Sequence, residues 1–365
     1  MKGLLLVPLA LALPLAAGAQ EAPPPTFEER IEVTEVLLDV LVSDREGNVI
    51  IGLGPEDFVV EEDGKEVPVQ GVTFYSNRRF LETAGAATKL RIDPDEVPQD
   101  RYFVLFFHDQ RAANVESPGL MARQLEAGRE ARKWVRGELL PNDWAAVVSY
   151  DQKLKVQADF TRDRGALERA IGDAVAGKDP GGNWPSRLPA AAPGRDQPPS
   201  LLAGLPSGNE LRDRTPTVYE GLQVLARALG NVRGRKNLLL FTIGFGRVNP
   251  FGLYEPDPRY YPDTKQALND HNVAVYAVDL VPTGTEHTMA NAMHQLADET
   301  GGRYLFNFTS FASPLRQIAE ENNGYYLLAY QSRHPAGEQG YREVTVKTRN
   351  PEFRVRAREG YRFGD

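Results

Sequence analysis

The chain has 365 residues, 41% of them hydrophobic, which is enough apolar material for a sizeable core. It contains no cysteine, and this excludes disulfide bonds, thiolate metal sites and a cysteine nucleophile. Its formal net charge of −8 argues against a general affinity for nucleic acid or anionic lipid.

Residues 1–19 are typical of a signal peptide. One lysine precedes a leucine- and alanine-rich run, and the run ends at Ala19 in the small-residue pattern of a cleavage site. A membrane anchor is the alternative, but Pro8 and Pro14 interrupt a run that is shorter than the roughly 20 residues needed to span a bilayer. We therefore expect export to the periplasm or the medium, and no transmembrane segment in the mature chain.

Residues 26–95 are expected to form the N-terminal half of a β-sandwich. Short apolar stretches alternate here with turn residues, and Asp63-Gly64 is a typical hairpin turn. The stretch has too few strands to bury a core by itself.

Residues 99–315 show a different period, in which apolar strands alternate with amphipathic helices. The strands are YFVLFF, WAAVVSY, LKVQADF, NLLLFTIGF and VAVYAVDL, and the helices are expected near 118–138, 163–176, 217–230 and 287–300. This pattern predicts an α/β domain with a mostly parallel sheet covered by helices on both faces. LKVQADF follows the preceding strand so closely that it should form an antiparallel edge hairpin.

Within this domain, residues 177–210 form a proline- and glycine-rich insertion with little periodicity. A structureless loop of this length is usually either functional or disordered. We expect disorder; Trp184 and Leu201-Leu202 leave room for the alternative, a docked lid or a partner-binding segment.

Residues 320–365 return to a β pattern. The stretches 324–332, 341–348 and 352–363 alternate apolar and polar residues as half-exposed antiparallel strands do. We expect them to complete the sandwich begun by the N-terminal segment, with the α/β domain inserted between the two halves.

This order of elements, with an aspartate loop after the first strand and a threonine loop before a later helix, resembles a von Willebrand factor type A (VWFA) domain. The flanks EVLLDVLVSDREGNVIIGLGPEDFVVEEDGKEVPV and GYYLLAYQSRHPAGEQGYREVTVKTRNPEFRVRAREGY resemble those of exported VWFA-related proteins of Acidobacteria-like bacteria. The resemblance covers nearly the whole mature chain. It implies a Rossmann-like domain inserted in an all-β sandwich.

The resemblance also implies a metal-ion-dependent adhesion site at the carboxyl edge of the sheet, in degenerate form. Asp109 matches the first aspartate and Thr217 the threonine, but Arg111 and Ala113 replace two serines and Ile243 replaces a later aspartate. One carboxylate and one hydroxyl are a poor shell for Mg²⁺, which prefers several hard oxygen ligands. We therefore expect no metal; Asp109 and Thr217 are the residues that would hold one.

The expected function is metal-free binding of a protein or peptide in the cell envelope. Arg111 brings a rigid cation to the position of the ion, where it pairs with Asp109 or receives an acidic group of the partner. The alternative is that Arg111 points into solvent and Asp109 only caps a turn. Aromatic anchors such as Phe245 and Phe251 fit an interface. The expected contact loops are 108–117, 213–218 and 243–250, and the expected ligand-binding residues are Asp109, Arg111, Thr217 and Phe245.

A cell-envelope hydrolase that uses His108 and Asp109 as its catalytic pair is the alternative function. Against it, the chain has no G-x-S-x-G nucleophile motif. His287 and His294, seven positions apart, form a surface or capped pair rather than a metal site, because no third ligand stands at a suitable spacing.

Overall fold

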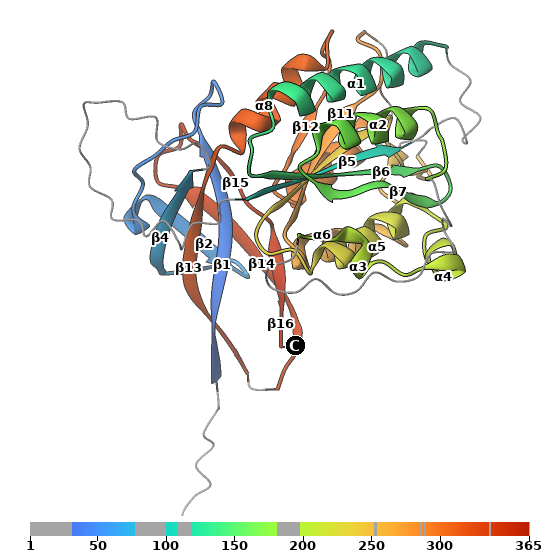
Figure 1. Cartoon of the computed structure of the whole chain (residues 1–365). Coiled ribbons are helices and arrows are strands. Elements are labelled where there is room, and N and C mark those ends of the chain that lie inside the picture. The colour runs from blue at the N-terminus through green and yellow to red at the C-terminus, as the bar shows by residue number, and fades with distance from the viewer. Residues whose placement is uncertain are drawn as a thin grey trace, which may run out of the picture.

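The computed structural model describes residues 31–76, 100–108, 118–180, 198–251, 254–284, 287, 289–335 and 337–364. It contains an antiparallel β-sandwich and, beside it, an α/β unit with a mostly parallel sheet (Figure 1). The expected fold class is confirmed. The signal-peptide segment, Asp109, Arg111 and Trp184 lie outside the described residues.

The sandwich combines strands from both ends of the chain. One sheet has the order β15-β1-β13-β4 and the other β16-β14-β2-β3. The N-terminal strands are β1 (Ile31–Ser43), β2 (Phe58–Glu62), β3 (Lys65–Val67) and β4 (Val69–Ser76), and a single 3₁₀ turn, η1 (Pro55–Asp57), precedes β2. The C-terminal strands are β13 (Gly324–Pro335), β14 (Gly340–Thr348), β15 (Arg354–Arg356) and β16 (Gly360–Phe363). Every sheet therefore mixes the two halves, as the strand count required.

The core of the sandwich follows the period of two in β1. Val36, Leu38 and Val40 are buried between the sheets, whereas Leu37 points outward. The register of β1 with β13 runs antiparallel from Ile31↔Pro335 to Val40↔Tyr326. One expectation was wrong in detail: 352–363 is not a single strand, because β15 pairs with β1 in one sheet while β16 pairs with β14 in the other.

The α/β unit has a six-stranded sheet in the order β12-β11-β8-β5-β6-β7. Its strands are β5 (Arg101–His108), β6 (Asp143–Tyr150), β7 (Leu154–Thr161), β8 (Lys236–Thr242), β11 (Val273–Asp279) and β12 (Arg303–Leu305). All neighbours run parallel except β7, which pairs antiparallel with β6 at the edge. The predicted edge hairpin is confirmed.

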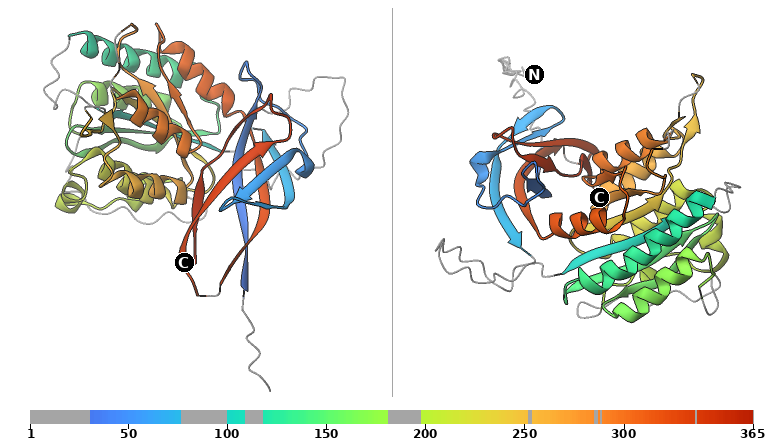
Figure 2. Two further views of the ribbon diagram at one scale, coloured as in Figure 1. Left: turned by 180° about the vertical axis from the view of Figure 1, so that it is seen from behind. Right: turned by 90° about the horizontal axis from the view of Figure 1, so that it is seen from above.

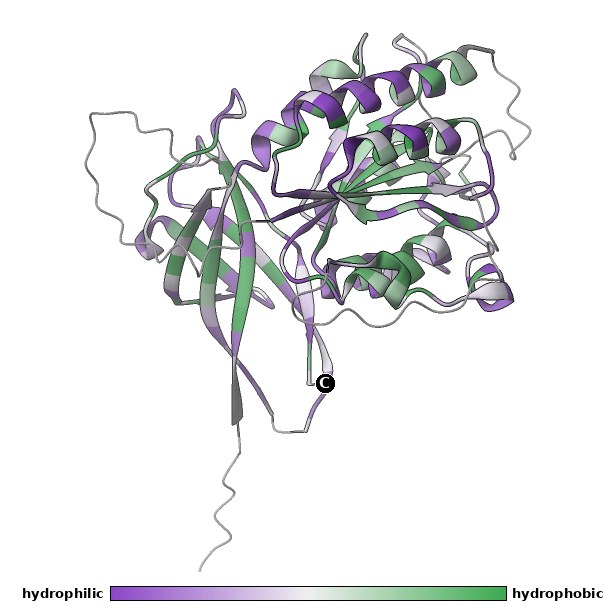
Figure 3. Ribbon diagram, in the orientation of Figure 1, coloured by the Kyte–Doolittle hydropathy of each residue, from purple (hydrophilic) through white to green (hydrophobic). Residues whose placement is uncertain are grey.

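Helices cover both faces of this sheet. One face is covered by α1 (Pro118–Gly137), α2 (Arg164–Val175) and α8 (Ala312–Glu321), and the other by α3 (Leu201–Gly204), α5 (Val218–Leu229), α6 (Tyr261–Asp270) and α7 (Ala290–Glu299) (Figures 1 and 2). The central strands are apolar along almost their full length, and the helices are apolar mainly on their inner sides (Figure 3). Among the described helices, none is long and apolar enough to cross a membrane.

The end of the proline-rich insertion is docked on the α/β unit. Asp159 on β7 accepts hydrogen bonds from the Ser200 hydroxyl at 2.6 Å and from the Leu201 amide at 2.6 Å, and so holds the start of α3. Leu201 and Leu205 are buried in the core, and α4 (Gly208–Asp213) follows. Residues 198–210 are thus part of the folded unit; residues 181–197 lie outside the described part.

The sandwich packs against the amino edge of the parallel sheet. Asn272, just before β11, donates a hydrogen bond to the Asp39 carboxylate on β1. Lys236, at the start of β8, is buried near Asp39, and burial lowers its pKa to about 7. Arg358 bridges the two units by donating to the carbonyl oxygens of Asn269 and Leu37, both at 3.0 Å. The carboxyl edge of the sheet, at the opposite ends of the strands, is left uncovered by the sandwich.

A buried carboxylate joins the two halves of the sandwich. Glu62 on β2 accepts hydrogen bonds from Tyr330 at 2.9 Å, Ser332 at 2.8 Å and Tyr361 at 2.7 Å. Burial raises the pKa of Tyr361 to about 12, so its hydroxyl stays protonated and donates at neutral pH. Because the donors come from β13 and β16, one N-terminal side chain organises both C-terminal strands.

We expect Glu62→Ala to lower the free energy of unfolding by about 3 kcal/mol, because it leaves buried hydroxyl donors without an acceptor. Glu61→Ala, on the exposed side of the same strand, removes only an ion pair with Lys347 and should cost less than about 1 kcal/mol. Urea unfolding of both variants tests this. Equal losses in the two variants would show that the Glu62 network does not stabilise the sandwich.

Candidate functional site

The carboxyl edge of the α/β sheet is formed by the loops after β5, β8 and β11, where open α/β sheets bind ligands. The loop after β5 carries Asp109 and Arg111, which lie outside the described residues, so their role stays a prediction. The neighbouring loops are described in full around 241–251 and in most of 280–289.

His108, the last residue of β5, lies beside the loop after β8. Its Nδ1 is 2.9 Å from the Thr242 hydroxyl, which also accepts the Gly244 amide at 2.9 Å. Gly244 has φ +99°, a left-handed conformation that glycine adopts without strain. Thr242 has no exposed surface, so this contact between His108 and Thr242 joins the ends of two neighbouring strands inside the protein.

Thr217 lies at the N-terminus of α5, where the threonine loop was expected. Its hydroxyl accepts the Glu220 amide at 3.2 Å and donates to the Glu220 carboxylate at 2.8 Å, and that carboxylate accepts the Thr217 amide at 3.1 Å. This is a reciprocal capping box, which satisfies amides that helix formation leaves open. The Thr217 side chain is therefore engaged in holding the helix start.

Phe245 lies in the loop after β8, and its side chain turns inward. Its ring packs edge-on against Tyr219 at 4.9 Å and lies 6.1 Å from the His108 ring. Only 8% of Phe245 is exposed, so it supports the loop from inside. The structure thus brings His108, Phe245 and the start of α5 together in one packed group.

Two exposed aromatic residues lie at this edge: Phe306, directly after β12, and Phe251, in the hairpin formed by β9 (Arg247–Val248) and β10 (Tyr254–Glu255). Phe251 is 87% exposed and Val248 is 53% exposed. Asn249 fixes the tip by accepting the Phe251 amide at 3.0 Å and donating to Glu255 at 3.2 Å. Gly246 lets the two strands approach, since a Cβ there would lie 2.6 Å from the Glu255 carbonyl oxygen. The hairpin presents its apolar tip to solvent.

A second group of polar side chains links the loop after β8 to the loop after β11. The His287 Nδ1 lies 2.9 Å from the Asp279 carboxylate, and its Nε2 lies 2.9 Å from the Ile243 carbonyl oxygen. The Tyr304 hydroxyl donates to the same carboxylate at 2.8 Å. Ile243 stands where the resemblance expects an aspartate, and its buried side chain offers no ligand to a metal.

This geometry favours a protonated His287. A carbonyl oxygen only accepts, so Nε2 carries a proton, and the Asp279 carboxylate favours a proton on Nδ1 as well. Burial opposes the charge, but the hydrogen bonds with Asp279 and Ile243 outweigh it and raise the pKa of His287. Burial and the Asp279 carboxylate also raise the pKa of Tyr304, so that its hydroxyl remains a donor.

Within the described ranges, no three His, Asp or Glu side chains are grouped closely enough to hold a metal ion. His294 pairs with Asp298 on α7 at 2.9 Å and is mostly exposed, while His287 precedes that helix and is largely buried. The two histidines pair with different carboxylates, but both rings lie beside Tyr304. The expectation of a surface pair is wrong for His287, which is largely buried.

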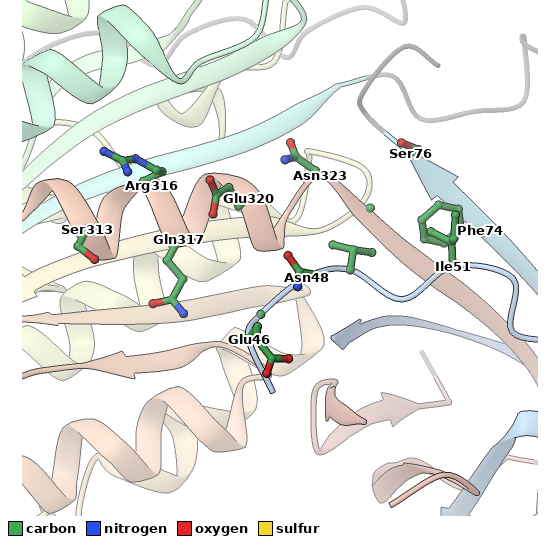
Figure 4. A pocket seen from close by; sticks show the side chains of 13 residues that line it. Glu46, Asn48, Ile51, Phe74, Ser76, Ser313, Arg316, Gln317, Glu320 and Asn323 are labelled. Carbon is green, nitrogen blue, oxygen red and sulfur yellow. The ribbon is translucent and has the colours of Figure 1, made fainter. Parts of the chain in front are cut away.

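One cavity, of about 480 Å³, lies beside His287 and is lined by Tyr304, Phe306 and His294. Another cavity, of about 710 Å³, lies between α8 and the sandwich. Figure 4 shows the second cavity, with Arg316 and Glu320 on the α8 side. The sandwich side carries the apolar residues Ile51 and Phe74 together with polar ones, Glu46, Asn48 and Ser76. Its mixture of charged, amide and apolar groups does not single out one ligand chemistry.

The sequence analysis did not identify Asp279, Tyr304 or the role of His287. A signal for Asp279 was available, because it follows an apolar strand just as Asp109 does. No such signal was available for Tyr304 and His287, because they come close to Asp279 only through the packing of β12 and of the loop after β11.

No protein-family model matches the sequence, and no curated protein matches it. Among solved structures, the von Willebrand factor domain of the pilus tip protein Mfa5 from Porphyromonas gingivalis is 13% identical, with TM-score 0.38, and the match covers 61% of this chain and 95% of that one. BatB from Bacteroides thetaiotaomicron is 13% identical, with TM-score 0.36 and coverage of 61% and 96%. Proximal thread matrix protein 1 from the mussel byssus is 12% identical, with TM-score 0.35; the match covers 61% of this chain but only 48% of the mussel protein.

The His287 pair should give a pH-dependent contribution to stability. A raised pKa means that the stabilisation is complete below the ordinary histidine value of about 6.5 and is lost as the pH rises through the raised value. We expect His287→Gln to lower the free energy of unfolding by about 2 kcal/mol at low pH and by less above the raised pKa. His294→Gln, an exposed matched control, should show a small difference that does not vary in this way. Urea unfolding across the pH range measures both; a constant His287→Gln loss would contradict the protonated pair.

Proposed function

We propose that this chain is an exported binding protein that captures a protein or peptide partner of the cell envelope at the carboxyl edge of its α/β sheet, without a metal ion. Export rests on the signal-peptide pattern of residues 1–19. The observation that carries the binding role is the β9–β10 hairpin, which displays an almost fully exposed aromatic side chain at an edge that the sandwich leaves open. Exposed aromatic residues on rigid supports are typical anchors of protein interfaces.

Buried residues beneath the hairpin hold its base in place. Phe245 and Tyr219 pack under the loop after β8, and His287 ties that loop to the one after β11. A preformed surface loses less conformational entropy when it binds than a mobile one does. In this proposal Arg111 and Asp109 add a charged contact beside the apolar one, and Thr217 shapes the edge by starting α5.

Phe251→Ser should abolish or weaken capture by at least about tenfold, because an anchor side chain contributes about 2 kcal/mol or more to an interface. The melting temperature should not change, since Phe251 is almost fully exposed. The matched control is Ile51→Ser, which removes another exposed apolar side chain, 66% exposed, from the sandwich. Quantitative pull-down of the partner from native cell envelope compares the two. Equal loss in both variants would place the contact elsewhere.

Metal independence has its own test. The mature protein should show no micromolar binding of Mg²⁺ or Mn²⁺ in titration calorimetry, because Ile243 and the capped Thr217 leave too few oxygen ligands. Capture should be unchanged by EDTA and lost in Arg111→Ala. Micromolar binding that Asp109→Ala abolishes would overturn the metal-free reading while leaving the capture surface itself open to the Phe251 test.

A further inference from the structure

A cavity of about 920 Å³ lies between the sandwich and the amino edge of the parallel sheet. Residues 34–37 of β1 and 361–363 of β16 form one side, and the C-terminal ends of α5 and α6 form the other. Figure 1 shows α6 beside β14 and β16 in this region. The cavity is at the opposite edge of the sheet from the capture surface, and its volume is within the range of small-molecule sites.

The charge of the lining differs from that of the whole chain. The formal net charge of the protein is −8, yet three arginines and two histidines line the cavity against two carboxylates, Glu35 and Asp270. Asp270 is paired with Arg362 at 3.2 Å. Within the lining, Arg227 and Arg358 remain opposite Glu35, and the Asp39 carboxylate outside the lining also acts on Arg358. The lining itself has more arginines than carboxylates, which favours an anion.

Arg358 is a half-buried cation of this lining. Its two terminal nitrogens donate to the carbonyl oxygens of Asn269 and Leu37, which are uncharged. Its Nε is buried and has no hydrogen-bond partner among the described residues. Burial lowers the pKa of the guanidinium, although the carboxylates of Asp39 and Asp270 partly oppose the shift. A buried donor without an acceptor costs free energy, so the Arg358 side chain is held here at some expense.

Arg227 supplies a second cation from the last turn of α5. It is exposed, and it forms no ion pair or side-chain hydrogen bond with any residue in the described part of the chain. Leu37, which is 48% exposed, and Phe363 add an apolar wall to the same cavity. Charged and apolar groups therefore lie next to each other in the lining, since Arg358 donates to the Leu37 carbonyl oxygen and Arg362 precedes Phe363.

We propose that this cavity binds a small organic anion whose carboxylate or phosphate group lies between Arg227 and Arg358, with its apolar part against Leu37 and Phe363. Guanidinium groups suit both acids, because their planar N–H donors match the oxygen pairs of carboxylate and phosphate. Each terminal nitrogen of Arg358 donates one of its two N–H groups to a carbonyl oxygen, and the second N–H is left for the anion. The site is independent of the partner surface, so either proposal can fail without the other.

The test is titration calorimetry on the mature protein at low ionic strength, with four probes: inorganic phosphate, phenyl phosphate, acetate and benzoate. We expect saturable binding at one site per chain, with phenyl phosphate or benzoate tighter than the matching probe without a ring. Comparison of the two phosphates with the two carboxylates identifies which acid the site prefers. Arg227→Ala should weaken binding by at least about tenfold, because it removes a charge-assisted hydrogen-bond donor.

Arg233→Ala is the matched control, since Arg233 is also exposed, follows α5 closely and does not line the cavity. It should bind as the wild type does. The ligand-induced rise in melting temperature is a second readout, and it should appear in the wild type and Arg233→Ala but not in Arg227→Ala. Absence of saturable binding for all four probes, or equal binding by Arg227→Ala and the wild type, would overturn the proposal.

Discussion

The antiparallel pairing of β1 with β13 is the constraint on which the rest of the molecule depends. Thr34 and His334, which share a hydrogen bond, are 300 positions apart in the chain. The same sheet pairs Ser76 with Gly324, the residues at which the chain leaves the sandwich and returns to it. The α/β unit therefore only needs to bring its two ends close together. It does so because its first strand, β5, and its last helix, α8, both have an end at the seam, the boundary between the sandwich and the α/β unit.

At the seam, Glu321 on α8 joins the two units, because it pairs with Arg303 of the α/β unit and with Arg356 of the sandwich. On the α/β side of the seam, Arg101 forms a bidentate pair with Asp143 and donates to the Ala319 carbonyl oxygen. Such groups add little to net stability, but each is costly if its partner moves away. The sandwich is thus held against the amino edge, and the carboxyl edge with its Phe251 hairpin stays clear.

Much of this fold could be predicted because the spacing of apolar residues shows which faces of a strand or helix are buried, and because the number of strands in each segment shows whether it can bury a core alone. The parallel strands appear as apolar runs, and the edge hairpin follows from a connection too short for a crossover. The split of β15 and β16 could not be predicted, since both lie in one alternating stretch and only the sheets decide which partner each takes. The candidate site was harder still: Phe245 and Phe251 are the same residue type in the same loop region, and only packing against Tyr219 buries one of them.

The β1–β13 pairing also sets an order of events in time. Synthesis begins at the N-terminus, so β1 exists long before its partner, and its apolar side chains Val36, Leu38 and Val40 have no sheet to join until β13 appears. Closing a long loop costs only about 0.6 kcal/mol for each doubling of its length. The chain between β1 and β13 therefore adds little to the free-energy cost of pairing them, and least when the α/β unit is already compact. The α/β unit, whose strands lie in one continuous stretch, can therefore fold first, and the sandwich is completed last around a strand that has been exposed throughout.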